Sequence, residues 1–98
     1  MAKLKLIIIT PKNIALEKEI DGVTVPSTEG EMTILPRHIN LFALLEEGVV
    51  HYWTGEDGEY LAIGGGYVET DGGGSEIIGL KSIWTGGYRY RTDTRGSG

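Results

Sequence analysis

The residues that could carry chemistry are few, and most of them stand in segments typical of turns. The two histidines, His38 and His51, have no third ligand at a spacing that metal sites use. Three pairs of carboxylates could provide acid–base catalysis: Glu29 with Glu31, Glu46 with Glu47, and Glu56 with Asp57. A glycosidase pair needs a cleft between its members, whereas carboxylates in turns are normally solvated. The chain contains no cysteine, which excludes thiolate chemistry. We therefore expect no enzyme, no metal and no cofactor.

The run Gly64-Gly65-Gly66 is the one segment that resembles a phosphate-binding loop. It lacks the Gly-Lys-Ser/Thr ending and the following helix that aim backbone amides at a phosphate. We interpret it as a glycine bulge within a strand.

Charge divides the chain into two unequal parts. The formal net charge is −5 over 98 residues, a length suited to one domain, and it argues against a nucleic-acid-binding protein. Residues 1–80 are acidic, whereas residues 81–98 are basic and rich in aromatics. Arginines and aromatics in alternation can bind single-stranded nucleic acid, but they are also typical of an edge strand. Because the remainder is acidic, we favour the edge strand, with a disordered end.

Short strands joined by tight turns account for most of the sequence. Alternating or continuous apolar runs, separated by Pro, Gly and Asp-Gly punctuation, predict strands. The expected strands are 3–10, 14–20, 23–25, 32–35, 41–45, 49–54, 60–63, 67–70 and 75–80. Lys and Glu in 14–20 also suit a helix, but we favour a strand because the segment is short and ends at a turn dipeptide. Pro26 is expected to end one of them, and Asp57-Gly58 is expected to form a type I′ hairpin turn. About eight to ten short, mainly antiparallel strands at this spacing predict a small all-β sandwich.

Residues 23–45 are interpreted as a docking edge. Their apolar runs flank the acidic turn Glu29-Gly30-Glu31 and a Pro36-Arg37-His38 corner. Charged turns held between stiff strands suit contact with a partner better than they suit catalysis.

The order and spacing of several segments resemble the N-terminal β-sandwich domain of the epsilon subunit of F-type ATP synthases. The match begins at residues 4–11 and 21–26, is strongest over TEGEMTILPRHINL at residues 28–41, and continues through 48–50 and 60–69. The resemblance covers most of residues 1–80, which we take as the epsilon-like domain, with residues 81–98 as an atypical tail.

The resemblance implies a non-catalytic rotor subunit of a proton-translocating ATP synthase, peripheral on the cytoplasmic face of an energy-transducing membrane. It implies that the domain binds the gamma subunit and the ring of c subunits, and so helps couple rotation to ATP synthesis. The acidic turn would face the ring, and the Arg37, His38 and Asn40 segment would lie at the junction of gamma and the ring. Thr10, Ala43 and Gly64 fall at positions on the side that faces gamma.

Two departures from the family pattern stand out. Arg37 replaces the glycine that usually stands between Pro36 and His38. The family's full-length chain continues into two antiparallel helices that regulate ATP hydrolysis, and residues 81–98 show no helical pattern, so that role is not carried over. An engineered or recombined β-domain without a partner, and a small binder of single-stranded nucleic acid, are the alternative hypotheses.

Overall fold

The computed structural model describes residues 3–36, 41–71 and 77–93, which form strands in two layers. The eight strands are β1 (Leu4–Ile9), β2 (Ile14–Ile20), β3 (Gly22–Ser27), β4 (Gly30–Ile34), β5 (Phe42–Thr54), β6 (Asp57–Asp71), β7 (Ile77–Ser82) and β8 (Thr85–Asp93). The order is β2-β1-β7-β6-β5-β3-β4, and β8 pairs with β6. All pairs are antiparallel except β1 with β7. The predicted all-β sandwich is confirmed.

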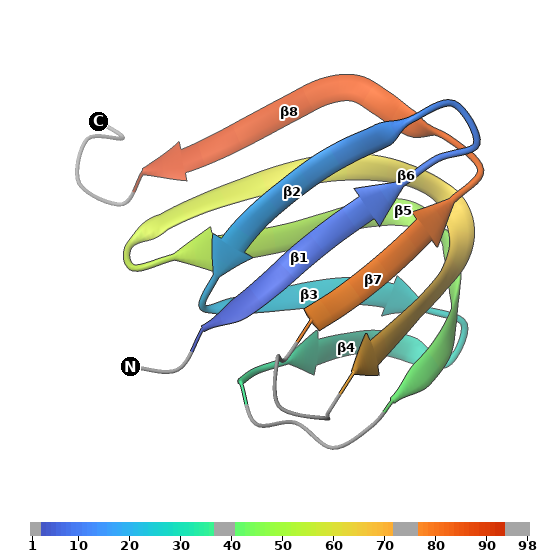
Figure 1. The fold of residues 1–98 in the computed structure, drawn as a ribbon. Helices are drawn as coiled ribbons and strands as arrows, with labels where there is room; N and C mark the ends of the chain where they lie inside the picture. The colour runs from blue at the N-terminus through green and yellow to red at the C-terminus, as the bar shows by residue number, and fades with distance from the viewer. Residues whose placement is uncertain (1–2, 37–40, 72–76, 94–98) are drawn as a thin grey trace.

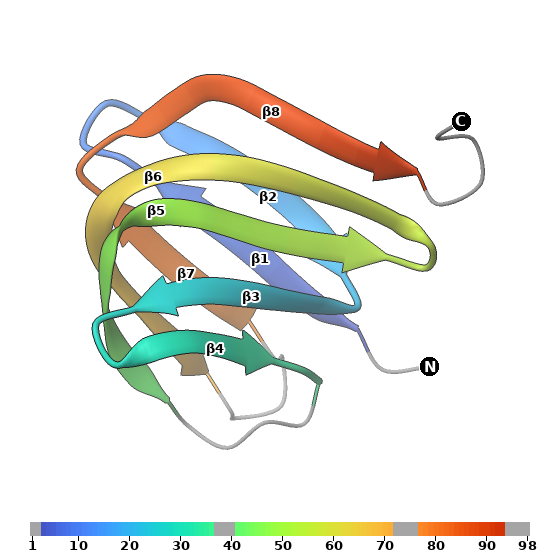
Figure 2. The same ribbon diagram turned by 180° about the vertical axis from the view of Figure 1, so that it is seen from behind.

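The two layers share their longest strands. In Figure 1, β2, β1 and β7 lie in front, and β8, β3 and β4 lie behind with the β5–β6 hairpin. β6 pairs with β8 along its first half and with β7 from Gly66 onward. β6 therefore bends near its middle and passes from one layer to the other (Figure 2). No helix in the described ranges is long and apolar enough to cross a membrane.

The prediction that β5 and β6 are each two strands was wrong. Residues 46–48 and 64–66 are typical of turns, but here the β5–β6 pairing keeps one register from Phe42 with Glu69 to Thr54 with Asp57. The glycines supply the bend inside a strand, with φ of +92° at Gly65 and +134° at Gly66. The prediction that this run lies within a strand and bends it is thus confirmed, but the register does not shift there, so the run is not a bulge.

Two local predictions of strand ends were also wrong. β3 continues through Pro26 to Ser27, and the β3–β5 register shifts between Thr24 and Ser27, around the residue that has no N–H. The β5–β6 loop is formed by Gly55 and Glu56 rather than by Asp57-Gly58, because Asp57 already pairs with Thr54. Gly55 has the positive φ, +62°, that a two-residue hairpin loop requires.

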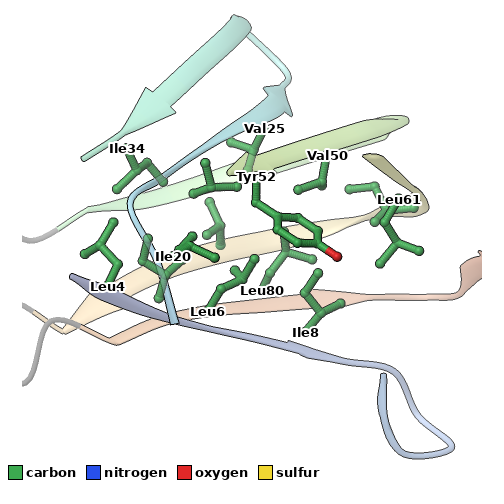
Figure 3. Packing of buried hydrophobic residues seen from close by; sticks show 14 of the residues in the cluster. Leu4, Leu6, Ile8, Ile20, Val25, Ile34, Val50, Tyr52, Leu61 and Leu80 are labelled. Atoms are coloured by element: carbon green, nitrogen blue, oxygen red, sulfur yellow. The ribbon is translucent and has the colours of Figure 1, made fainter. Parts of the chain in front are cut away.

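Alternation along the strands fills the space between the layers with apolar side chains. β1 places alternate residues inward, and Figure 3 shows them facing side chains from β5, β6 and β7. The fully buried members include Leu6, Ile8, Tyr52, Ile63 and Leu80. Burial of each such side chain stabilises the fold by about 1.5–3 kcal/mol, which makes this cluster the main source of stability.

Asp21 ties three segments together at one end of the sandwich. Its carboxylate accepts a hydrogen bond from the Gly55 N–H at 2.6 Å and from Lys3 Nζ at 2.9 Å. Its own N–H donates to the Trp53 carbonyl at 2.8 Å. The Gly55 N–H and then the Lys3 ammonium hold the pKa of Asp21 below its ordinary value.

We expect an Asp21→Asn variant to lose less stability in acid than the parent chain does. A carboxyl group whose pKa is lowered by folding stabilises the folded state above its unfolded pKa, and this contribution disappears as the pH falls through the folded pKa. Urea denaturation between about pH 5 and about pH 2 should therefore give a shallower decline for the variant. Glu56→Gln, at an exposed turn residue, is the control and should keep the parent's slope. Equal slopes for Asp21→Asn and the parent would contradict this assignment.

Candidate partner-docking surface

A groove of about 410 Å³ lies where β1 and β7 end, beside the bend in the middle of β6. It is lined by Ile9, Thr10, Pro11, Gly66, Tyr67, Lys81, Ser82 and Ile83, and we call it the outer groove. A second hollow of about 310 Å³ continues it past the β1–β2 turn and shares Thr10, Pro11 and Ile83. The two hollows share these residues, and the walls of the outer groove are mainly apolar.

A row of side chains beside the groove crosses the outer face of β1, β7, the second half of β6 and the start of β5. Backbone pairing sets Ile9 next to Lys81, Lys81 next to Tyr67, and Tyr67 next to Leu44. The Tyr67 ring lies 5.3 Å from that of Phe42, centroid to centroid, and 5.7 Å from Lys81 Nζ. Phe42 is 60% exposed, Leu44 55% and Ile83 70%. Clustered large apolar side chains of this kind mark an interaction surface, because single exposed ones are usually scattered.

Sequence analysis missed this surface, although a signal for it was present. Residues 41–45 are all apolar, so a strand there must show apolar side chains on both of its faces. Leu45 points inward and is buried, and Phe42 and Leu44 point outward. An apolar outward face in a layered β protein is the sign that something else covers it.

The structure brings Thr10 and Gly64 to the same end of the molecule. Thr10 is half-buried, lines the outer groove, and its N–H donates to the Asn13 carbonyl at 2.9 Å. The Gly64 N–H donates to the Trp84 carbonyl at 2.9 Å and to Ser82 Oγ at 3.0 Å. A side chain at position 64 would overlap the Trp84 indole, so the glycine lets the β7–β8 link lie against β6.

Ala43 takes a different position from its neighbours on β5. It is half-buried and packs against the core, whereas Phe42 and Leu44 on either side are exposed. At this part of β5, a partner can therefore touch the side chains of Phe42 and Leu44, whereas the methyl group of Ala43 faces the core.

The acidic turn projects from the β3–β4 hairpin on a firmly held backbone. Ser27 Oγ donates to the Gly30 carbonyl at 2.5 Å and accepts from the Glu29 N–H at 3.1 Å. The N–H of Thr28, which lies between these two residues in the chain, donates to the Leu44 carbonyl at 3.0 Å and so links the turn to β5. Glu29 and Glu31 are both exposed. The turn thus presents two carboxylates to solvent at a fixed place.

Three of the predicted contact residues, Arg37, His38 and Asn40, lie outside the described residues. The other histidine, His51, is a half-buried strand residue whose ring stacks on Tyr60 with centroids 4.3 Å apart. Among the side chains that the structure describes, those of residues 3–36, 41–70 and 77–86, no three His, Cys, Asp or Glu are grouped so as to hold a metal ion.

Comparison with known families decides what this sandwich is. A sequence model of the ATP synthase delta/epsilon chain β-sandwich domain matches residues 3–84. The chain belongs to this family. The epsilon chain of Sulfurovum sp. is 38% identical over 72 residues, which are 72% of this chain and 56% of the relative. The epsilon chain of Dehalococcoides mccartyi (strain CBDB1) is 41% identical over 69 residues, 70% of this chain and 49% of the relative.

This member of the delta/epsilon family spans about half the length of the curated relatives that it matches. Its fold is also that of a chain in the Euglena gracilis mitochondrial ATP synthase, in a structure of OSCP, F1 and the c-ring. That likeness has a TM-score of 0.80 at 18% identity and covers 88% of this chain and 54% of the other. A Tetrahymena thermophila chain, from a structure of the ATP synthase central stalk and c-ring, has a TM-score of 0.67 at 14% identity. That match covers 97% of this chain and 72% of the other. At these identities the likeness shows the fold alone.

Proposed function

We propose that this chain is a non-catalytic rotor-stalk domain of an F-type ATP synthase. In this proposal it binds the gamma subunit through the outer groove and the c-ring through its acidic turn, and so helps to couple rotation to ATP synthesis. The observation that carries the proposal is the apolar outer surface, in a chain whose family supplies the stalk. The domain would lie at the cytoplasmic face of the membrane, held there by its partners.

The contact with gamma is supported by the chemistry of the groove. A partner that covers Leu44, Tyr67 and Ile83 removes a contiguous apolar area from water, which favours binding by about 25 cal/mol per Å² before the costs of association. Thr10 and Lys81 also line the groove and supply polar groups of the kind that protein interfaces include. Gly64 contributes indirectly, because it lets the Ile83–Trp84 link take its place.

The contact with the c-ring is supported by the charge and the rigidity of the β3–β4 turn. Exposed carboxylates on an ordered backbone steer a docking partner toward basic groups and fix its orientation. Glu29 and Glu31 are the proposed contacts here. Arg37, His38 and Asn40 remain proposed contacts on the strength of the resemblance.

An Ile83→Asp variant should weaken binding to gamma by about tenfold or more, because an unpaired carboxylate would be buried where an apolar side chain fits. The tagged chain would be coexpressed with gamma from a bacterium with a similar epsilon chain. Its affinity would then be measured by isothermal titration calorimetry.

The matched control for this measurement is Val49→Asp. Val49 is 50% exposed on the part of β5 that pairs with the first half of β6, away from the groove. This variant should bind gamma within about threefold of the parent chain, since no proposed contact changes. If the parent chain fails to bind gamma, or if both variants lose affinity equally, the proposed docking surface is wrong.

A further inference from the structure

β8 is an addition beyond the part of the chain that matches the family. The match ends at residue 84, and β8 runs from Thr85 to Asp93. Figure 2 shows β8 as the outermost strand beside β6. Among the described strands, β6 is its only pairing partner. β8 therefore covers a sheet edge that the matched part of the chain leaves open.

The pairing of β8 has two unequal parts separated by glycines. Thr85 pairs with Ile63 in the same register that joins Ser82 to Gly66, so the chain first continues the β7 ladder. The register then shifts, and one β6 residue, Ala62, stands opposite residues 86–88, which begin with Gly86-Gly87. Pairing resumes from Arg89 with Leu61 to Asp93 with Asp57. We call Arg89–Asp93 the β8 arm.

The arm has the features of a strand that can open by itself. It follows two glycines, which give the backbone freedom at the point where the register shifts. Among the described strands the arm pairs only with β6, so a single ladder holds it. A strand at the edge of a sheet, held by one ladder, opens at a lower free-energy cost than strands that are paired on both sides.

We propose that the edge of β6 from Asp57 to Leu61 is a strand-binding site. The β8 arm occupies this site within its own chain, and the same segment of a second copy can occupy it when the arm opens. The unpaired N–H and C=O groups of an open edge are a template for an added strand, and backbone hydrogen bonds provide the affinity. The arm of the same chain is always close to this edge, so its effective concentration there is high. A segment from a second copy can therefore bind only while that arm is open.

A double-cysteine variant, Asp57→Cys with Asp93→Cys, allows both states of the arm to be compared in the same protein. Oxidation holds the arm closed by a disulfide, and reduction leaves it able to open. These two residues pair across the β6–β8 ladder, and the chain has no other cysteine to compete. We expect oxidation to give an intramolecular disulfide in a monomer. Failure of this disulfide to form would overturn the proposal, because it would show that the arm does not lie on this edge.

Binding is then measured by fluorescence anisotropy with a labelled synthetic peptide of residues 85–93. The reduced variant should bind this peptide about tenfold or more tightly than the oxidised one does. A peptide of the same composition in scrambled order is the control and should bind neither form. Equal binding to both forms, or no binding to the reduced form, would overturn the proposal.

Hydrogen exchange on the unaltered chain gives a second test that needs no substitution. Amides of residues 89–93 should exchange at least about tenfold faster than the paired amides of β7. Exchange of the arm as slow as that of β7 would show that the arm does not open by itself, and would overturn the proposal. None of these measurements involves the gamma subunit, so their outcome is independent of the proposed function.

Discussion

Replacing Gly66 by valine should leave little folded protein at room temperature. Gly66 has φ of +134°, a conformation that side chains other than hydrogen rarely adopt. A Cβ atom there would overlap the backbone carbonyl of Lys81 on β7, which cannot rotate away as a side chain could. Backbone strain of about 1–3 kcal/mol and a comparable cost of overpacking together approach the whole stability of a small domain.

The matched control for this change is Gly79→Val. Gly79 also lies within a strand, on β7, but a Cβ there would meet no atom within 4 Å and its φ is not in the left-handed region. Valine suits a strand, so the free energy of unfolding of this variant should lie within about 1 kcal/mol of that of the parent. Circular dichroism during thermal unfolding would compare the two. A cooperative transition of Gly66→Val near that of the parent would show that β6 does not need this bend.

The same bend explains which parts of the fold could be predicted from the sequence. β1, a strand with a clean alternation, was predicted within a residue or two, because burial on one face imposes a period of two. The run at residues 64–66 was expected to bend the chain, yet it was also taken to end a strand. Local sequence shows that the backbone bends there, but only the neighbouring ladders show that pairing continues through the bend.

The surface was harder to predict than the fold. Thr10 and Gly64 are 54 positions apart, and the parallel pairing of β1 with β7 brings their regions to one end of the sandwich. The alternation of apolar residues within a strand does not show which distant strand it pairs with, so this parallel pair could not be predicted. The acidic turn, by contrast, is local: Glu29-Gly30-Glu31 between two apolar runs predicts an exposed hairpin turn, and the structure has one.

The second large effect is expected at Tyr52, the largest of the fully buried side chains. Figure 3 shows its ring between the layers, near Ile8, Leu61 and Leu80. Tyr52→Ala would leave a cavity in this cluster and should lower the free energy of unfolding by about 3–5 kcal/mol. The midpoint of a urea denaturation curve measures this loss, provided that the slope of the transition is unchanged.

Tyr52→Phe separates the two contributions of this residue. The Tyr52 hydroxyl donates to Glu59 Oε1 at 2.6 Å, at the margin of the core, where Glu59 is half-buried. Removing the hydroxyl alone should cost about 1.5 kcal/mol, since hydrogen bonds to charged groups contribute about 1.5–3 kcal/mol and this one lies near solvent. Packing would then account for most of the loss in Tyr52→Ala. If instead both variants lost the same stability, the hydrogen bond to Glu59 would be what holds the β5–β6 hairpin, and the ring would add little.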